Sequence, residues 1–287
     1  MGEKVAIITD TIGCIPEEIL KKYNIHEVPL GITFGDKVYK DRVDLKADEF
    51  YKMLKEAERL PTTSGPPPES FVDAYNEISR VANRILCITL SKKLSSTYNS
   101  AKLAGDMIKE KLSNITVEIL DSQTAAAAEG FVVIAAAKAA SMGKSFNEVM
   151  EAAKNTLSRV HLLAIIDTFH YLSKGGRVPK AVDWAGSLLK IKPILTIRAG
   201  EACLATNSRT TLNAMNRMLE LMKERVINGS PLHVAVMHAA EPERALYLKK
   251  QISDMFSCNE LWVTDFTPVM GAHTGPGLVG VAFYNGD

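Results

Sequence analysis

The amino-acid sequence has few cysteines and no excess of either charge. Its four cysteines lie far apart and form no CxxC pair, so the 287 residues offer neither a disulfide framework nor a zinc-ligand pattern. We therefore expect a reducing, cytoplasmic environment and no bound metal. The chain has 34 Lys and Arg residues against 33 Asp and Glu residues, a net charge of +1. Proteins that bind nucleic acid, or that bind anionic membranes through charge, normally have a basic excess, so neither is an expected partner.

The sequence also lacks an apolar run long enough to cross a bilayer. The most apolar stretch, residues 125–140, is interrupted by Glu129 and Lys138. It is shorter than the roughly 20 residues that a transmembrane helix needs. The apolar run near the N-terminus is too short for a signal peptide. We expect a buried helix over 125–140 and no transmembrane segment.

Cofactor motifs are absent or stand in the wrong context. Residues 275–280 spell GxGxxG, but they precede the last expected strand, whereas a dinucleotide site follows a strand and begins a helix. Gly143-Lys144-Ser145 lacks the earlier glycine of a phosphate-binding loop, because Lys138 stands there. No cofactor is expected.

Strands and helices alternate along the first half of the chain. Apolar runs at 5–8 and 85–90 predict buried strands, residues 117–120 predict a third strand, and helices are predicted to follow them at 16–23, 96–111 and 124–141. This alternation is typical of an α/β fold with a mostly parallel sheet flanked by helices. Residues 28–43, with two glycines and alternating apolar residues, predict a small hairpin.

The second half predicts an α+β domain. Residues 192–197 and 201–206 predict an antiparallel pair of strands, and the Gly-Gly pair at 175–176 is expected to open a helix. Length alone favours two domains. We place the N-terminal α/β domain at residues 1–158 and the C-terminal α+β domain at residues 159–287.

Two hydroxyl-rich segments precede predicted helices. Thr63 and Ser64 stand before a run of prolines, and Ser95 and Ser96 follow the buried strand at 85–90. Hydroxyl side chains cap helices, and the N-terminus of a helix attracts anions. The carboxyl ends of parallel strands are also where ligands collect. The two segments therefore predict either simple helix caps or a shared site for an oxyanion.

A histidine and an arginine stand beside glycines. His273 lies within Gly271-Ala272-His273-Thr274-Gly275-Pro276-Gly277, which predicts a tight loop, and Arg177 follows Gly175-Gly176. A structural histidine and a solvated arginine are the alternatives to a functional role. Arginine is the natural partner of a carboxylate or phosphate.

These segments, in this order, resemble the DegV family of bacterial fatty-acid-binding proteins, which includes the substrate-presenting subunit of fatty acid kinase. The resemblance covers the whole chain and is carried by the following motifs: Ile8-Thr9-Asp10-Thr11, Thr63-Ser64, Leu94-Ser95-Ser96-Thr97-Tyr98, Ile119-Leu120-Asp121-Ser122, Leu172-Ser173-Lys174-Gly175-Gly176-Arg177, Lys192-Pro193-Ile194-Leu195, and residues 271–277. The sequence departs from the family in three places. Glycine is usual where Ser96 stands, a polar residue is frequent where Gly65 stands, and the usual Asp-Gly turn after Ile197 is missing.

The resemblance implies a two-domain fold with a long-chain fatty acid in a buried tunnel to which the C-terminal domain contributes. It implies that the carboxylate is bound by Thr63, Ser95 and His273. It further implies that the tunnel mouth or a partner surface includes Ser64, Ser96, Arg177, Arg209 and Thr274. The implied partner is a cytoplasmic, dihydroxyacetone-kinase-like fatty acid kinase subunit that phosphorylates the presented carboxylate, so that the chain itself is not an enzyme.

Two other functions stay open from the residues alone. Ser95 and His273 could be the nucleophile and base of a hydrolase or transferase acting on a small acylated or phosphorylated substrate, although Ser95 lacks the GxSxG motif. The chain could also be an interaction or regulatory module that binds no ligand.

Overall fold

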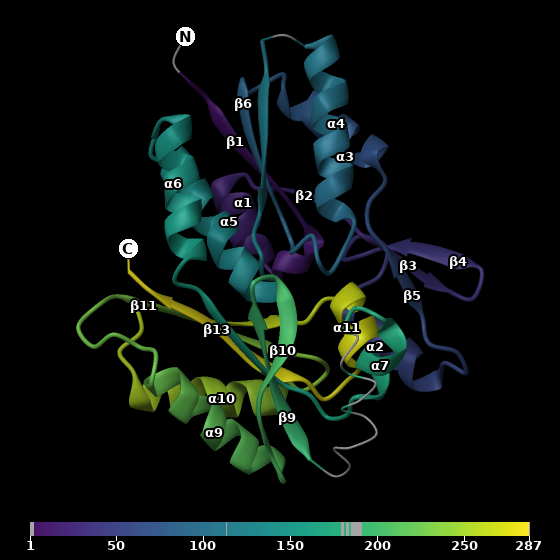
Figure 1. The fold of residues 1–287 in the computed structure, drawn as a ribbon, viewed down its shortest axis with the longest axis vertical. Helices are drawn as coiled ribbons and strands as arrows, with labels where there is room; N and C mark the ends of the chain where they lie inside the picture. The colour runs from purple at the N-terminus through teal and green to yellow at the C-terminus, as the bar shows by residue number, and fades with distance from the viewer. Residues whose placement is uncertain (1–2, 113, 179–180, 182–183, 185–190, 287) are drawn as a thin grey trace.

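The protein is represented by a computed structural model that describes residues 3–112, 114–178, 181, 184 and 191–286 (Figure 1). The first half forms a parallel sheet with the strand order β2-β1-β6-β7. Its strands are β1 (Val5–Asp10), β2 (His26–Val28), β6 (Arg84–Thr89) and β7 (Thr116–Asp121). Ile8 and Cys87 face one layer of the core, whereas Ile7 and Leu86 face the other. This alternation is expected of strands that are buried on both faces. The predicted parallel sheet is confirmed.

Helices cover both faces of this sheet. One face carries α3 (Pro68–Ile78) and α4 (Thr97–Lys111), and the other carries α1 (Glu17–Tyr23), α5 (Ala126–Ser141) and α6 (Phe146–Leu157). Helix α5 is buried on nearly all sides, because Val132 and Val133 pack on this sheet while Ala127 and Phe131 belong to a core shared with the second half. Its almost uniformly apolar sequence follows from that position.

A small antiparallel sheet extends from the first half. It has the order β4-β3-β5, with β3 (Gly31–Phe34), β4 (Lys37–Lys40) and β5 (Thr62–Ser64). The predicted hairpin is confirmed as β3 and β4, whereas β5 was not predicted. Neither were α2 (Ala47–Glu56) and the short 3-10 helix η1 (Thr11–Gly13).

The second half forms a mixed sheet with the order β10-β9-β8-β13-β11-β12. Neighbouring strands are antiparallel except β11 and β12, which are parallel. The strands are β8 (His161–Ile165), β9 (Lys192–Arg198), β10 (Glu201–Ser208), β11 (Leu232–His238), β12 (Glu260–Asp265) and β13 (Val279–Asn285). Helices α9 (Thr211–Lys223) and α10 (Pro242–Met255) pack on one face. The predicted α+β half is confirmed.

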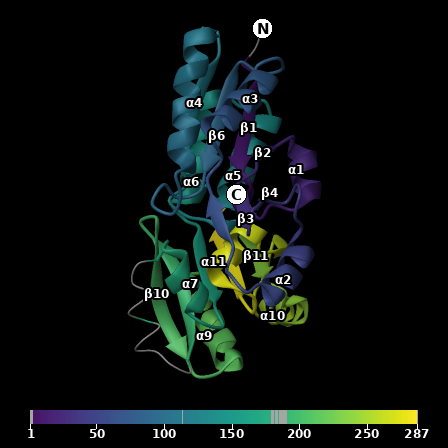
Figure 2. The ribbon, with the colours of Figure 1, turned by 90° about the vertical axis from the view of Figure 1, so that its right-hand side faces the viewer.

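The other face of the second sheet packs against the first half. Ala164, Ala235 and Met237 from this sheet share a core with Ala127 and Phe131 of α5. Figures 1 and 2 show the two sheets at opposite ends of the molecule, with α2, β3 and α11 (Pro268–Thr274) at their junction. The proposed domain boundary at residue 158 falls between α6 and β8 and stays a prediction.

Two glycine-rich segments differ from their predictions. The Gly-Gly pair at 175–176 closes a helix that was not predicted, α7 (His170–Gly175), because Gly176 has a left-handed φ of 68°. Most of residues 179–190, where the expected helix would run, lies outside the described residues. Of residues 271–277, expected to form a tight loop, the first four end helix α11, and the tight turn comes only at Gly275 and Gly277 with φ of 73° and 91°.

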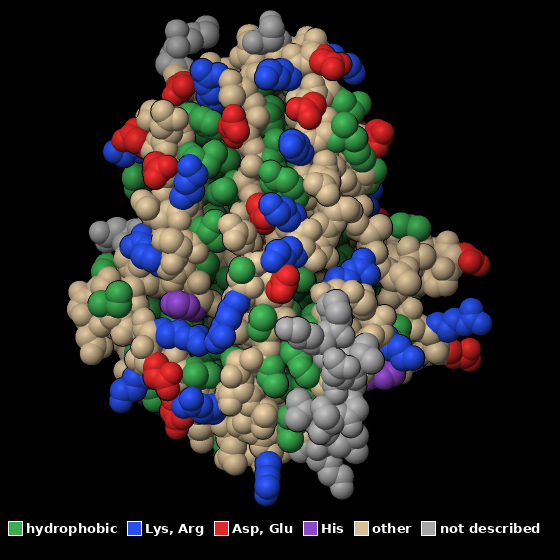
Figure 3. Space-filling model, in the orientation of Figure 1, with side chains coloured by type: hydrophobic (Ala, Val, Ile, Leu, Met, Phe, Trp, Pro, Cys, Tyr) green, Lys and Arg blue, Asp and Glu red, His purple; other side chains and the backbone are tan. Residues whose placement is uncertain are grey.

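Acidic and basic side chains are interspersed over the face seen in Figure 3, which agrees with the net charge of +1. Within the described ranges, no helix is both long and apolar enough to cross a membrane.

Candidate functional site

A cavity opens at the junction of the two halves. Its empty volume is about 880 Å³, part of which is open to solvent. Most of its lining is apolar and comes from both halves of the chain: Ile12, Leu30, Leu90, Leu94 and Ala125 from the first, and Leu162, Ala164, Ile166, Leu172, Val178, Leu195, Ile197, Ala202, Phe266, Val269, Met270 and Leu278 from the second.

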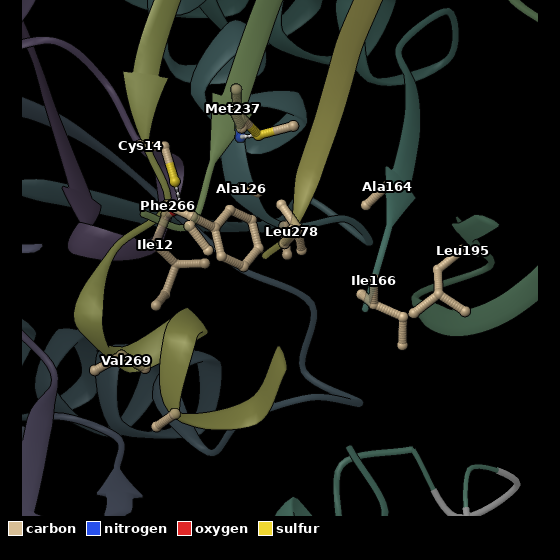
Figure 4. Packing of buried hydrophobic residues seen from close by; sticks show 14 of the residues in the cluster. Ile12, Cys14, Ala126, Ala164, Ile166, Leu195, Met237, Phe266, Val269 and Leu278 are labelled. Carbon is tan, nitrogen blue, oxygen red and sulfur yellow. Dashed lines mark hydrogen bonds between the residues drawn. The ribbon is translucent and has the colours of Figure 1, made fainter. Parts of the chain in front are cut away.

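Figure 4 shows how these walls are arranged. Ile12, Phe266 and Leu278 lie on one side of an open space, and Ile166 and Leu195 lie on the other. Ile12 lies in η1, just before α1. Ile166 directly follows β8, and Leu195 lies in β9. The cavity therefore exists only because the second sheet packs against the carboxyl end of the first.

Thr63 and His273 belong to the polar part of the cavity wall. Thr63 Oγ1 lies 2.8 Å from His273 Nε2, although the two residues are 210 positions apart. Strand β5 places Thr63, since its backbone pairs with Ile32 of β3, and the last turn of α11 places His273. The structure thus brings together two residues that the sequence singled out separately.

His273 is held in its neutral form. Burial, together with the nearby positive charge of Arg177, lowers the pKa of His273 to about 4. Its Nδ1 atom is buried and has no hydrogen-bond partner among the described residues. Gly175 packs against this side of the ring, and a Cβ atom there would lie 2.5 Å from Nδ1. A glycine at 175 is therefore required by the close approach of the imidazole.

Arg177 lies at the edge of the same site. Its Nη2 donates a hydrogen bond to the carbonyl oxygen of Thr63 at 3.3 Å, and its Nη1 donates to that of Gly175 at 3.0 Å. The side chain is exposed. The guanidinium thus connects β5 to the end of α7 and remains accessible from outside.

Ser95 reaches the cavity from the segment between β6 and α4. Its Oγ atom lies 2.8 Å from Thr97 Oγ1 and accepts a hydrogen bond from the Thr97 amide at 3.3 Å. Gly65 packs against this segment: a Cβ atom on Gly65 would lie 2.8 Å from Ser96 Oγ and 3.3 Å from Ser95 Oγ. The missing side chain at 65 lets the Thr63 and Ser95 segments meet.

The other predicted site residues differ in position. Ser64 lines the cavity and is exposed, and Thr274 lines it but is buried and donates a hydrogen bond to the Met270 carbonyl at 3.1 Å. Ser96 is exposed at the start of α4, outside the cavity lining. Arg209 is exposed between β10 and α9 and does not line the cavity.

The expected capping of the two helices is only partly correct. Thr63 and Ser64 do not cap α3, because they belong to β5, and the helix begins with Pro68 after Pro67 without a side-chain cap. At α4, Ser96 occupies the cap position without capping, and Ser95 bonds the Thr97 amide instead. Pairing with β3 has overridden the local preference of the hydroxyl residues.

A family model described as an uncharacterised protein of the DegV family matches residues 4–286. The chain belongs to the DegV family. It is 31% identical to the DegV protein of Bacillus subtilis, over 97% of this chain and 98% of that protein. It is 35% identical to a DegV domain-containing protein of Clostridium acetobutylicum, over 98% of this chain and 97% of the relative.

Solved structures of DegV proteins have the same fold. The crystal structure of DegV of Bacillus subtilis, described as a fatty acid binding protein, matches with a TM-score of 0.91 at 30% identity, over 99% of this chain and 100% of that one. A DegV family protein from Thermus thermophilus, described by its fatty acid binding, matches with a TM-score of 0.92 at 25% identity, over 98% and 99% of the two chains.

The polar groups of this DegV-family chain do not form a serine–histidine pair. His273 Nε2 is joined to Thr63 and Ser95 Oγ to Thr97, and within the described part of the chain no hydrogen bond joins Ser95 to His273. Nor do three or more His, Cys, Asp or Glu side chains of the described residues gather in a way that could hold a metal ion.

A buried acidic group beneath the cavity was missed in the sequence. Asp10, Asp41 and Glu129 are all fully buried. The signal was present, since Glu129 interrupts an otherwise apolar run and Asp10 follows a buried strand. Without tertiary contacts, however, nothing in the sequence relates the two residues to each other or to the cavity.

Proposed function

We propose that this DegV-family chain binds a long-chain fatty acid in the cavity, with the carboxylate at Thr63, Ser95 and His273 and the acyl chain among the apolar walls. The observation that carries the proposal is the placement of these polar groups in a cavity whose lining is otherwise mostly apolar. The fatty-acid-binding descriptions of the two DegV structures support it.

The apolar part of the cavity supplies the driving force for binding. Burying one methylene is worth about 0.8 kcal/mol, so an acyl chain with ~14 methylenes gains about 11 kcal/mol before ordering costs. Desolvation of the carboxylate opposes this by several kcal/mol unless hydrogen bonds replace water. The hydroxyl groups of Thr63 and Ser95 can provide those bonds.

The neutral state of His273 allows the hydrogen bonds of this site to run in one direction, from the histidine towards the ligand. When Nε2 carries the hydrogen and donates it to Thr63 Oγ1, the Thr63 hydroxyl hydrogen is left free for the carboxylate. The resulting chain of hydrogen bonds runs from His273 through Thr63 to the ligand. It neutralises the head group without placing a full positive charge against it.

We further propose that the bound carboxylate is presented in the cytoplasm to a dihydroxyacetone-kinase-like subunit, which forms the acyl phosphate, so that this chain binds and presents but does not catalyse. A site of hydroxyl groups leaves the carboxylate oxygens nucleophilic. Ser64, Ser96 and Arg177 are exposed in or near the Thr63 and Ser95 segments and are the proposed partner surface, and the exposed Arg209 is a further candidate for it.

The binding proposal is tested by extracting and weighing the lipid that co-purifies with the protein. Wild type should carry about one fatty acid per chain, and Thr63→Ala combined with Ser95→Ala should carry far less. Thr62→Ala is the matched control, because Thr62 is exposed in the same strand and does not line the cavity. A wild-type protein that neither carries nor takes up fatty acid would overturn the proposal.

The presentation step has a separate test. Lipid-loaded protein is incubated with ATP and a kinase subunit of the stated class, and acyl phosphate is trapped as a hydroxamate. We expect Arg177→Ala to lower this yield while the amount of bound lipid stays near that of wild type. Equal yields from both proteins would remove Arg177 from the partner surface.

A further inference from the structure

Asp10 lies beneath the cavity and joins two of its walls. It ends β1 and is fully buried. Its Oδ1 atom accepts a hydrogen bond from the Ile12 amide, and its Oδ2 atom accepts one from the Leu90 amide, both at 2.9 Å. Ile12 and Leu90 both line the cavity, and Leu90 begins the segment that leads to Ser95. A single carboxylate therefore sets the distance between the end of β1 and the end of β6.

Glu129 reaches the same carboxylate from α5. It is fully buried, and its carboxyl group is close enough to that of Asp10 for a side-chain hydrogen bond between the two to lower the pKa of Asp10 and raise that of Glu129. Its Oε1 atom accepts a long hydrogen bond of 3.5 Å from Thr9 Oγ1. Its Oε2 atom receives no hydrogen from any N–H or O–H group of the described residues.

Two carboxyl groups in such contact share a proton, because two negative charges cannot be buried side by side. The backbone amides of Ile12 and Leu90 each direct a hydrogen at one oxygen of Asp10 and cannot turn away. Asp10 is thus suited to be the charged partner. Glu129 Oε2, which receives no hydrogen, is suited to carry one.

The surroundings favour the same assignment. Burial raises the pKa of Glu129 well above its usual range, and burial together with the charge of Asp41 raises that of Asp10 to about 7. The positive charge of Arg42 is engaged with Glu27 at 2.7 Å. The titratable and charged groups that act on the pair or respond to its charge are Cys14, Glu27, Asp41, Arg42 and Cys87.

We propose that Glu129 keeps its proton in the folded protein and donates it in a hydrogen bond to Asp10, and that this bond fixes the Asp10 carboxylate that holds the Ile12 and Leu90 walls of the cavity. Glu129 is then a positioning residue, which acts on the ligand only through Asp10. For its effect on lipid the inference rests on the proposed function, whereas the proton assignment stands without it.

The test compares Glu129→Gln with Glu129→Leu in the full chain. The glutamine amide can donate the same hydrogen bond but cannot ionise, whereas leucine is similar in size and donates nothing. With palmitate as the probe, we expect the dissociation constant at pH 7 to stay within about threefold of wild type in Glu129→Gln. In Glu129→Leu it should rise about tenfold, the equivalent of losing one hydrogen bond to a charged group.

A second readout is the stability of each protein between pH 5 and pH 8 in urea. The raised pKa values mean that Asp10 and Glu129 hold more protons in the folded wild type than in the unfolded chain, so the contribution of this pair to stability falls as the pH rises through this range. The stability of Glu129→Gln should fall less steeply with pH than that of wild type. The variant lacks the titrating carboxyl group at position 129, and its other titrating groups are the same as in wild type.

The outcomes separate the two proposals. If Glu129→Gln loses stability with pH as steeply as wild type, or binds palmitate as weakly as Glu129→Leu, the assignment of the proton to Glu129 is overturned. If wild type does not bind palmitate, the proposed function fails, and the comparison of pH profiles still decides the proton assignment. The comparison of wild type with Glu129→Gln also suffices if Glu129→Leu does not fold.

Discussion

Thr63 Oγ1 and His273 Nε2 lie 2.8 Å apart and join the small sheet of the first half to the last turn of helix α11 in the second half. The contact connects the two halves beside the cavity and orients the hydroxyl group that we propose as the donor to a fatty acid carboxylate. It is also the reason that a change at either residue should affect both binding and the junction of the halves.

Removal of the Thr63 hydroxyl group should weaken fatty acid binding even when the size of the side chain is kept. Valine has nearly the same volume as threonine, and a hydrogen bond to a charged group contributes about 1.5–3 kcal/mol, so Thr63→Val should bind palmitate about 10- to 150-fold more weakly. Titration calorimetry measures this. Thr62→Val, an exposed position in the same strand, should bind as wild type does. Equal losses in both variants would mean that strand β5, and not the hydroxyl, is responsible.

The pKa of His273 predicts a loss of stability in acid. It is lowered from an ordinary value of 6.5 to about 4, so between these values the unfolded chain binds a proton that the folded protein does not. The contribution of His273 to stability should therefore fall as the pH drops from 6.5 to 4, by at most about 3 kcal/mol. His273→Asn, which cannot take up this proton, should show a smaller fall in urea titrations at pH 6.5 and pH 4.5. Parallel curves for the two proteins would contradict the lowered pKa.

The close approach at Gly65 predicts a pair of compensating substitutions. A methyl group in Gly65→Ala would meet Ser96 Oγ at 2.8 Å and push the Ser95 segment away from Thr63. We expect a loss of about 1–3 kcal/mol in stability together with weaker palmitate binding. Adding Ser96→Gly removes the closer contact and should recover most of both, as thermal melts and calorimetry can show. An absence of recovery would place the cause elsewhere.

The buried hydroxyl group of Tyr51 is expected to stabilise the junction of the two halves. Tyr51 in α2 donates a hydrogen bond at 3.0 Å to the carbonyl oxygen of Phe266, a residue of the cavity wall. Tyr51→Phe should lower the free energy of unfolding by about 1 kcal/mol or somewhat more, because a buried carbonyl loses its donor. Tyr23→Phe is the control, since no hydrogen bond of the Tyr23 hydroxyl occurs among the described residues and its ring is partly exposed. Equal stability of Tyr51→Phe and wild type would show that the bond contributes nothing.

Much of the fold could be predicted from the sequence. The strands β1 and β6 and the helix α5 follow from local apolar patterns, because a largely buried strand and a helix buried on nearly all sides have distinctive compositions. Beyond the strands and helices themselves, the motifs around Thr63, Ser95 and His273 identified the family.

The failures lie where long-range contacts outweigh local preference. Thr62–Ser64 resembles a helix cap but forms a strand, since β3 offers it backbone partners that the α3 terminus does not. The residues before Gly275 resemble a loop but form α11, because Val269 and Ala272 are buried in the shared core.

The sequence by itself thus determined the class of fold, the alternation of elements and the residue types available for binding a carboxylate, because these depend on short-range periodicity and side-chain chemistry. Only the tertiary structure decided which of those residues meet. The distance between Thr63 and His273 and the cavity between the two halves arise from packing one sheet against the end of another, and the contact of Asp10 with Glu129 arises from packing helix α5 against the end of β1. No local sequence pattern encodes that geometry, because each strand, helix or loop can form with the same local contacts whether or not its distant partner is in place.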